Sequence, residues 1–97
     1  MLNPVDFSGR PFHLVGIGGI GMSAIAYILA KQGFTVSGSD LSSNRITQKL
    51  QDLGVKVFKG HHADNIDLAN APQVVCSTAI NQQNPEFQVA LANGLPV

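Results

Sequence analysis

The residues that could do chemistry begin with a glycine-rich run, Gly16-Ile17-Gly18-Gly19-Ile20-Gly21-Met22-Ser23. Its spacing is Gly-x-Gly-x-x-Gly, and it lies between an apolar segment typical of a strand, 12–15, and one typical of a helix, 24–30. A strand that turns directly into a helix leaves backbone N–H groups unpaired at the helix N-terminus, where the helix dipole also favours negative charge. The run therefore predicts a site for a ligand that carries a diphosphate.

Each position of the run has a physical role in this interpretation. Gly16 permits the tight turn, Gly18 lets the backbone close on a phosphate, and Gly21 lets the helix pack closely against the strand. Gly19 and Ile20 belong to the same predicted site. The alternative is that these glycines serve packing alone, because a lone Gly-x-Gly-x-x-Gly motif has many false positives.

Three further polar clusters follow predicted strands, namely Ser39-Asp40, Gly60-His61 and Ser77-Thr78. In a doubly wound sheet, ligands bind beyond the carboxyl ends of the strands, near the point where the strand order reverses. We therefore expect these clusters and the glycine run to meet at one edge of the sheet.

The side chains in these clusters have two possible roles each. Asp40 ends the second predicted strand, where a carboxylate accepts hydrogen bonds from a ribose hydroxyl, but it could also cap the next helix. His61 either reaches the ligand or is an exposed loop residue. Ser77 and Thr78 offer hydroxyl groups to a phosphate or sugar, or to their local backbone.

The other histidines are expected to play structural or solvent-exposed roles. His13 lies within the first predicted strand, so we expect it to be packed and hydrogen-bonded. His62 is predicted to be an exposed loop residue. Because neighbouring side chains point in different directions, His61 and His62 do not form a metal pair.

Alternating apolar runs and turn residues predict the strands and helices that must position these side chains. Strands are predicted at 12–17, 34–37, 55–58 and 73–77, and 95–97 has the pattern of a fifth strand opening. Helices are predicted around 24–30, from a cap at 42–44 to Gly54, and at 85–93, with a short helix in the loop at 64–67. This order predicts a Rossmann-like, three-layer α/β/α domain with a mainly parallel sheet of about five strands.

Apolar spacing also predicts which helix faces are buried. The expected inward rows are Ile20, Ala24 and Ile28 with Ile25 and Leu29 in the first helix, Ile46, Leu50 and Leu53 in the second, and Phe87 and Leu91 in the third.

Composition limits the class of protein. The 97 residues are 44% hydrophobic and 12% charged, which fits one globular domain at 12–97 after a short leader at 1–11. Six basic and six acidic residues balance, so no electrostatic footprint for nucleic acid is expected. Cys76 lies in an apolar run and is interpreted as a buried structural thiol.

No targeting or membrane segment is evident in the sequence. The N-terminus lacks the apolar core of a signal peptide. The uncharged stretch 14–30 is shorter than the roughly 20 residues that span a bilayer, and its glycines divide it. We therefore expect a cytoplasmic protein with no membrane partner.

Motifs for catalysis are missing from this sequence. It has no Gly-x-x-x-x-Gly-Lys-Ser/Thr loop for ATP cleavage, no serine nucleophile elbow and no metal-ligand spacing. Its carboxylates lie on different segments. The residues favour a binding module, with no catalytic residue and no metal site.

Taken in order along the chain, five segments resemble the N-terminal domain of the Mur ligases. They are the glycine run, Gly38-Ser39-Asp40, Gly60-His61, Ser77-Thr78-Ala79-Ile80 and Asn84-Pro85-Glu86. The resemblance covers nearly everything from Phe12 onward. Thr78 departs from the family pattern, in which a second serine is common, but it keeps the hydroxyl group.

The resemblance implies a three-domain bacterial enzyme of peptidoglycan synthesis. Its first domain would hold the UDP portion of UDP-N-acetylmuramate, its central domain ATP and Mg²⁺, and its last domain an amino acid. Such a ligase phosphorylates a carboxylate and lets an amine attack the acyl phosphate. Only the first domain is present here, so this chain alone is expected to be inactive.

The resemblance also assigns roles to individual residues. Gly18 to Gly21 would cradle the diphosphate, and Asp40 would lie by the uridine moiety. His61 and the segment Ser77 to Ala79 would line the rest of the path for the nucleotide sugar.

Two other functions fit the glycine run and Asp40 when these are considered without the resemblance. An NAD(P)-binding domain of an oxidoreductase would share the glycines and Asp40 for the same physical reasons. A small nucleotide-sensing regulatory domain would need no catalytic group. The segments after Asp40 favour the ligase domain over both.

Overall fold

The computed structural model describes residues 9–76 and 80–95, and within them it contains one four-stranded sheet. The strands are β1 (Phe12–Val15), β2 (Val36–Asp40), β3 (Lys56–Lys59) and β4 (Gln73–Cys76), in the order β3-β2-β1-β4. Every neighbouring pair is parallel. The predicted α/β class and parallel sheet are confirmed.

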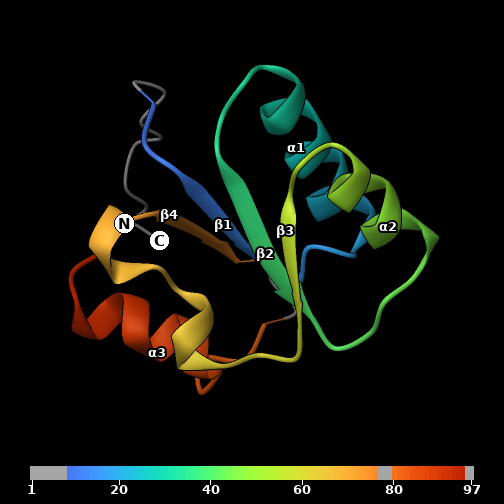
Figure 1. Ribbon diagram of the computed structural model, residues 1–97. Helices are drawn as coiled ribbons and strands as arrows, with labels where there is room; N and C mark the ends of the chain where they lie inside the picture. Colours follow the sequence, from blue (N-terminus) through green and yellow to red (C-terminus); the bar gives the residue numbers. More distant parts are fainter. Residues whose placement is uncertain (1–8, 77–79, 96–97) are drawn as a thin grey trace.

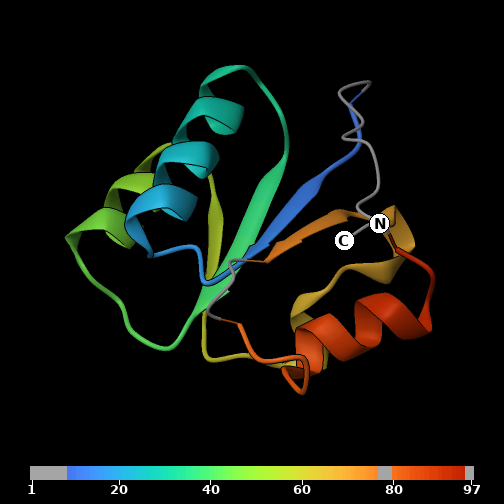
Figure 2. The same cartoon turned by 180° about the vertical axis from the view of Figure 1, so that it is seen from behind.

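Helices cover both faces of this sheet. Figures 1 and 2 show α1 (Ile20–Lys31) and α2 (Arg45–Asp52) together on one face and α3 (Pro85–Ala92) on the other. A core of Phe12, Leu14, Ile17, Met22, Ala26, Leu29, Val36, Leu50 and Val55 lies under α1 and α2. A second core of Val15, Ile66, Val74, Ala90 and Leu95 lies under α3.

The register brings the carboxyl ends of the strands together. Val15, the last residue of β1, is level with Ser39 of β2 and Cys76 of β4, and Ser39 is level with Phe58 of β3. The segments that leave these strands therefore start from the same edge of the sheet. This is the edge at which the sequence predicts the binding site.

The sheet differs from the prediction in its number of strands and in some strand ends, since β1 ends at Val15 and not at residue 17. The described residues contain four strands rather than about five, because Leu95 lies outside any strand and residues 96–97 lie outside the described part. The second strand covers Val36–Asp40 rather than 34–37. Polar residues Ser37, Ser39 and Asp40 hid its length, since strand patterns are read from apolar residues.

Local signals correctly predicted the starts of α2 and α3, whereas α1 begins at Ile20, before the predicted range 24–30. Asn44, one of three predicted caps, accepts a hydrogen bond from Thr47 N–H, and the Thr47 hydroxyl accepts one from Asn44 N–H in return. This reciprocal capping box begins α2. Pro85 opens α3, as predicted, and the Asn84 side chain caps it by accepting from Glu86 N–H. The loop at 63–70 forms two short 3₁₀ helices, Ala63–Asn65 and Leu68–Asn70.

The predicted inward faces of the helices are confirmed at Leu29 and Leu50 and are wrong at most of the other predicted positions. In α1 the buried residues are Met22, Ala26 and Leu29, whereas Ile20 is 87% exposed and Ile28 is 54% exposed. α1 is apolar on almost every side, so spacing alone could not select its inner face.

The other two helices also turn differently from the prediction. In α2 the buried residues are Thr47 and Leu50, while Ile46 and Leu53 are each 38% exposed. In α3 the inner residues are Glu86 and Ala90, and Leu91 is 54% exposed. The rotation of α3 places a carboxylate inside the domain.

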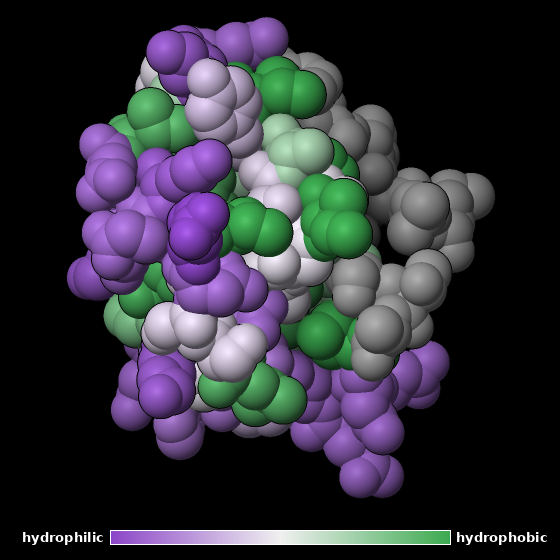
Figure 3. Space-filling view, turned by 90° about the vertical axis from the view of Figure 1, so that its right-hand side faces the viewer, coloured by the Kyte–Doolittle hydropathy of each residue, from purple (hydrophilic) through white to green (hydrophobic). Residues whose placement is uncertain are grey.

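The outer face of α1 is consequently apolar. Figure 3 shows several hydrophobic side chains in the middle of one face of the molecule, next to a hydrophilic region on the left of the view. Ile20, Ile25, Tyr27 and Ile28 are the large exposed hydrophobic residues of this helix. Among the described residues, no helix is long and apolar enough to cross a membrane.

Gly38 permits the close packing that the sequence predicts for Gly21. A Cβ atom at Gly38 in β2 would lie 2.5 Å from the Ile17 Cδ1 atom and 2.6 Å from the Leu14 carbonyl oxygen. A Cβ at Gly21 would meet nothing within 4 Å. The packing role predicted for Gly21 is therefore wrong, and Gly38 has that role.

Candidate functional site

The glycine loop is held against the end of β2 by backbone hydrogen bonds. Gly16 has a φ of 84°, which confirms the predicted need for glycine at this turn. The N–H groups of Gly16 and Ile17 donate to the Ser39 carbonyl oxygen at 2.8 and 3.0 Å. Gly19 N–H donates to the Gly16 carbonyl oxygen at 3.1 Å, which closes the turn.

The start of α1 provides the donors expected of an anion site. Gly19 is the N-cap and has no side chain, and the first helical hydrogen bond runs from Ser23 N–H to Gly19 oxygen at 2.8 Å. The N–H groups before Ser23 lie in the turn that an α-helix leaves without carbonyl partners. Ile20 and Gly21 are exposed, so the backbone there is accessible.

Asp40 lies directly against the loop. Its Oδ2 atom accepts a hydrogen bond from Gly18 N–H at 2.9 Å, and its Oδ1 atom accepts one from Ser42 N–H at 3.3 Å. A Cβ at Gly18 would come within 2.9 Å of the same Oδ2 atom. Asp40 thus lies beside the glycine loop, as the sequence predicts, and it does not cap α2, since Asn44 has that role.

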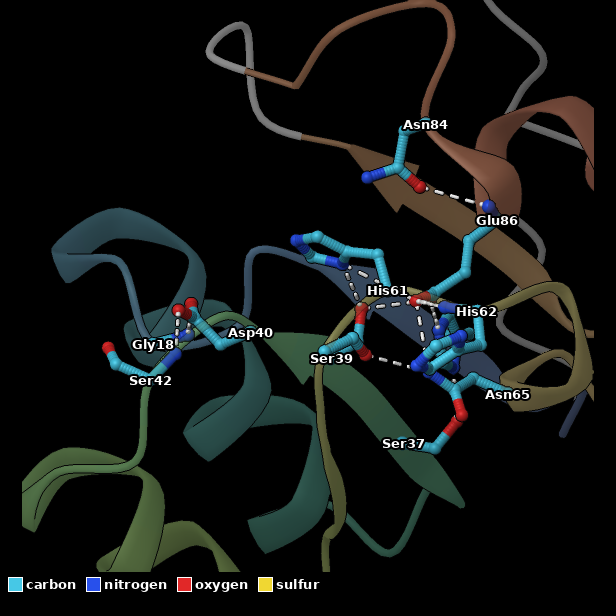
Figure 4. Close-up of polar contacts among 12 residues, drawn as sticks. Gly18, Ser37, Ser39, Asp40, Ser42, His61, His62, Asn65, Asn84 and Glu86 are labelled. Carbon is cyan, nitrogen blue, oxygen red and sulfur yellow. Dashed lines mark hydrogen bonds and ion pairs between the residues drawn. The ribbon is translucent and has the colours of Figure 1, made fainter.

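His61 lies at the same edge of the sheet, because the backbone of the preceding Gly60 is bonded to Asp40. Gly60 N–H donates to the Asp40 carbonyl oxygen at 2.7 Å, which ties the end of β3 to the end of β2. His61 Nδ1 lies 2.8 Å from Ser39 Oγ, and its side chain is 13% exposed. Figure 4 shows the ring between the Asp40–Gly18 pair and the Glu86 carboxylate. His62, as predicted, is exposed.

Ser39 faces inward, away from the role predicted for it. It is fully buried, and its hydroxyl group donates to Glu86 Oε1 at 2.8 Å while it also contacts the His61 ring. Within the described residues, the hydrogen-bond partners found for the Ser39 hydroxyl group are Glu86 and His61.

Glu86 is the centre of a buried polar cluster that the sequence analysis missed. Its side chain is 0% exposed, and it is held by groups from β1, β2, the loop after β3 and the first 3₁₀ helix (Figure 4). Its partners are His13 Nε2, Ser39 Oγ at 2.8 Å, His62 N–H at 3.2 Å, Asn65 Nδ2 at 3.1 Å and His61 Nδ1 at 3.4 Å.

These donors keep the Glu86 carboxyl ionised. Burial alone would raise its pKa, because a low-dielectric environment disfavours charge. Hydrogen bonds from His13, Ser39 and Asn65, together with the charge interaction with His13, outweigh burial and hold the pKa of Glu86 below its ordinary value. No buried side-chain nitrogen or oxygen in the described part of the chain lacks a hydrogen-bond partner.

His13 has the packed, hydrogen-bonded role that its place in the first strand predicts. It is 0% exposed, and its Nδ1 atom lies 2.8 Å from Ser37 Oγ while its Nε2 atom contacts Glu86. Its spacing within an apolar strand was the signal that located it. The partner, 73 residues away in sequence, had no local signal beyond a glutamate among the first residues of a helix.

The end of β4 is described only as far as Cys76. Burial and the nearby charge of Glu86 raise the pKa of the Cys76 thiol from 9.0 to about 11. The side chain is half-buried, whereas the sequence predicts a buried thiol. The predicted site residues Ser77, Thr78 and Ala79 lie outside the described residues.

Chemically, the assembled edge combines helix N–H donors, one carboxylate and one imidazole. Donors of this kind hold phosphate groups, and a carboxylate beside them accepts from hydroxyl groups. Within residues 9–76 and 80–95, no cluster of three or more His, Cys, Asp or Glu side chains could hold a metal ion. The arrangement is suited to binding a nucleotide-like ligand.

Comparison with known proteins gives consistent matches. The family model described as Mur ligase family, catalytic domain, matches residues 11–97. A UDP-N-acetylmuramate–L-alanine ligase of Cyanothece sp. is 56% identical over 98 residues, covering 100% of this chain and 20% of that protein. The ligase of the same name from Nostoc punctiforme is 50% identical over 114 residues, covering 100% and 24%.

Solved structures share the fold. A UDP-N-acetylmuramate:L-alanyl-gamma-D-glutamyl-meso-diaminopimelate ligase from Neisseria meningitides superposes with a TM-score of 0.81 at 30% identity, covering 92% of this chain and 28% of that one. A murein peptide ligase from Psychrobacter arcticus gives a TM-score of 0.81 at 29% identity, covering 91% and 18%. The chain spans between about a fifth and a quarter of the length of the two curated ligases named above.

Proposed function

Because this chain belongs to the Mur ligase family, we propose that it is the UDP-N-acetylmuramate-binding domain of an ATP-dependent ligase. The parent enzyme would join L-alanine to UDP-N-acetylmuramate in peptidoglycan synthesis. The observation that carries the proposal is the 56% identity to a UDP-N-acetylmuramate–L-alanine ligase across 100% of this chain. The geometry at the sheet edge supports the same ligand class.

In this proposal, residues 12–97 form the substrate domain and 1–11 a leader. The central ATPase domain and the C-terminal domain would lie in parts of the parent that this chain does not include. ATP and Mg²⁺ would bind there, since the sequence has no phosphate loop of the Gly-x-x-x-x-Gly-Lys-Ser/Thr type. The chain alone would bind substrate and would not form the amide.

The glycine loop would hold the diphosphate. The first N–H groups of α1 have no carbonyl partner within the helix, and the helix dipole adds to their attraction for phosphate. Gly18, Gly19, Ile20 and Gly21 line this start, and Gly16 provides the turn before it. The N–H groups of Gly18 and Gly19 already have protein acceptors, so the donors open to a phosphate are those of the first turn of α1.

Asp40 would accept a hydrogen bond from a ribose hydroxyl. Its carboxylate is anchored by Gly18 N–H and Ser42 N–H, and it lies beside the loop that would hold the diphosphate. Two negative groups would repel each other at contact, so Asp40 is suited to a neutral hydroxyl donor and not to a phosphate. His61 and the segment Ser77 to Ala79 would complete the path for the nucleotide sugar.

The test is an amide chemical-shift titration of this chain with UDP-N-acetylmuramate, with NAD in parallel. We expect shifts in the loop 16–21, at Asp40 and at His61 with the UDP-sugar and none with NAD. A response to NAD alone would instead favour the dehydrogenase-type domain that shares this geometry. No response to either ligand would contradict the claim that this domain holds the UDP portion.

We also propose that the protein works in the cytoplasm, where both a UDP-sugar and ATP are available. Cell fractionation with an antibody against this chain tests this location. Recovery in the membrane or secreted fraction would contradict it.

A further inference from the structure

We propose that Glu86 is a positioning residue that acts on His61 through Ser39. It would hold His61 with a proton on Nδ1, so that Nε2 is the ring nitrogen that accepts a hydrogen bond from a hydroxyl or N–H group of the ligand. The first part concerns the protein alone. The ligand contact rests on the proposed function.

The argument starts from the hydrogen-bonding capacity of Glu86. An ionised carboxylate only accepts hydrogen bonds, and the donors around Glu86 hold it in that form. Oε1 contacts His13 Nε2 and Ser39 Oγ, and Oε2 accepts from His62 N–H at 3.2 Å and Asn65 Nδ2 at 3.1 Å. Every group that reaches the carboxylate must therefore donate to it.

The single proton of the Ser39 hydroxyl is thereby assigned. Ser39 Oγ lies 2.8 Å from Glu86 Oε1 and 2.8 Å from His61 Nδ1. Because Glu86 has no proton to give, the Ser39 hydroxyl donates to Glu86. The contact with His61 then requires that Nδ1 carries a proton and that Ser39 Oγ accepts it.

The position of the proton on the His61 ring follows from this assignment. A neutral imidazole carries one proton, so a proton on Nδ1 leaves a lone pair on Nε2. The direct distance of 3.4 Å from Nδ1 to Glu86 Oε2 favours the same form, since two lone pairs there would repel. Figure 4 shows the second ring nitrogen on the side turned away from Glu86, toward Asp40 and Gly18.

The backbone beside the ring is fixed by the same carboxylate. His62 N–H donates to Glu86 Oε2, and Asn65 Nδ2 bridges Glu86 Oε2 and the Gly60 carbonyl oxygen at 2.9 Å. Gly60 N–H is bonded to the Asp40 carbonyl oxygen. Glu86 therefore sets both the position and the proton arrangement of His61.

His13 serves as an internal reference for the tautomer of His61, because both rings contact the same carboxylate. His13 also faces Glu86, but through Nε2, so that Nε2 carries a proton; when the ring is neutral, its Nδ1 atom, 2.8 Å from Ser37 Oγ, then accepts from that hydroxyl group. The two histidines around one carboxylate are thus expected to have opposite tautomers. The Cys76 thiol, which is also near Glu86, stays protonated because its pKa is about 11.

The test is ¹⁵N spectroscopy of the imidazole rings in the ligand-free chain at a pH of about 8.5, above the ordinary histidine pKa of about 6.5. We expect His61 to show a protonated Nδ1 and an unprotonated Nε2, and His13 to show the reverse. A proton on His61 Nε2 in this spectrum would overturn the proposal without any variant.

Two serines of β2 provide a matched pair of variants. Ser39→Ala removes the oxygen between Glu86 and His61, so we expect the His61 pattern to shift toward a mixture of tautomers. Ser37→Ala removes the partner of His13 and should alter only the His13 resonances. Glu86→Gln should disturb both rings, and an unchanged His61 spectrum in a folded Glu86→Gln variant would contradict the proposal.

The ligand contact is tested by adding UDP-N-acetylmuramate to the wild-type chain. We expect the His61 Nε2 resonance to shift more than Nδ1. If the amide titration shows binding but His61 Nε2 does not respond, the ligand contact is wrong and the proposed function stands. If no binding occurs, the proposed function fails while the tautomer assignment is still decided by the ligand-free spectrum.

Discussion

The carboxylate of Asp40 accepts a hydrogen bond from the Gly18 N–H at 2.9 Å, across 22 residues of sequence. This bond joins the end of β2 to the loop between β1 and α1, the two segments that the sequence singles out for binding. It also explains why a side chain at position 18 would be crowded, because its Cβ would lie 2.9 Å from the same oxygen.

Gly18→Leu should abolish binding of UDP-N-acetylmuramate. The new side chain would displace Asp40 and fill the approach to the loop, so we expect the Kd to rise at least 100-fold, about 2.7 kcal/mol. Isothermal titration calorimetry measures the effect, with circular dichroism to confirm the fold. Gln51→Leu, which adds leucine to the exposed face of α2, is the control and should bind normally. Normal affinity in a folded Gly18→Leu chain would exclude the loop as the diphosphate site.

Asp40→Asn should weaken the ligand only modestly. The amide would keep one oxygen for Gly18 or the ribose hydroxyl but would present an NH₂ group to the other donor. We expect a loss of about 0.5–1.5 kcal/mol, the usual contribution of one hydrogen bond. Calorimetry at fixed ionic strength measures it. An unchanged Kd would remove Asp40 from the binding site.

Gly38→Ala should destabilise the domain. Its Cβ would lie 2.6 Å from the Leu14 carbonyl oxygen, which cannot rotate away as a side chain can. Overpacking of a core typically costs about 1–3 kcal/mol, and we expect at least the upper end of that range in urea unfolding. Gly21→Ala is the matched control, because its Cβ meets open space; it should leave stability unchanged or raise it by up to about 1 kcal/mol.

The stability of the chain should fall in acid because of Glu86. Its folded-state pKa lies below the ordinary value of 4.5, so its ionised form stabilises the fold above that pH. This contribution is lost as the pH falls through the folded-state pKa. Urea unfolding between about pH 7 and pH 3 measures it, and Glu86→Gln should give a flatter curve over the acid range. Equal slopes for the two proteins would show that Glu86 is not the group responsible.

Cys76 should react slowly with thiol reagents. With its pKa raised from 9.0 to about 11, its thiolate fraction at pH 8 is roughly a hundredfold below that of an ordinary thiol. Alkylation by iodoacetamide, followed by mass spectrometry, should be slow in the folded chain and fast in urea. Glu86→Gln should speed the reaction in the folded state, since it removes the nearby negative charge. Equal rates in folded and unfolded chains would contradict the raised pKa.

The parallel sheet and the edge that holds the site could be predicted from the sequence because both follow from local signals. Glycine loops, caps and short apolar runs each act over a few residues. Gly16 at the turn, Asn44 at the α2 cap and Pro85 at the α3 start were all found in this way. The meeting of Asp40 with the glycine loop then followed from strand order.

The helix faces and Glu86 could not be predicted because they depend on distant partners. α1 is apolar on nearly all sides, so the choice of Met22, Ala26 and Leu29 as its inner row was set by the sheet beneath it. Hydrophobicity ranks Glu86 as an outward residue. Only the arrival of His13, Ser39 and Asn65 on the same side of the sheet makes its burial favourable.

The contact between His13 and Glu86 also joins two distant parts of the chain. The two residues are 73 positions apart, so their meeting closes most of the chain into a loop. If α3 leaves the sheet, His13 Nε2 and the Ser39 hydroxyl group lose the carboxylate that accepts from them. The buried polar side chains of β1 and β2 are therefore satisfied only while α3 is docked on the sheet.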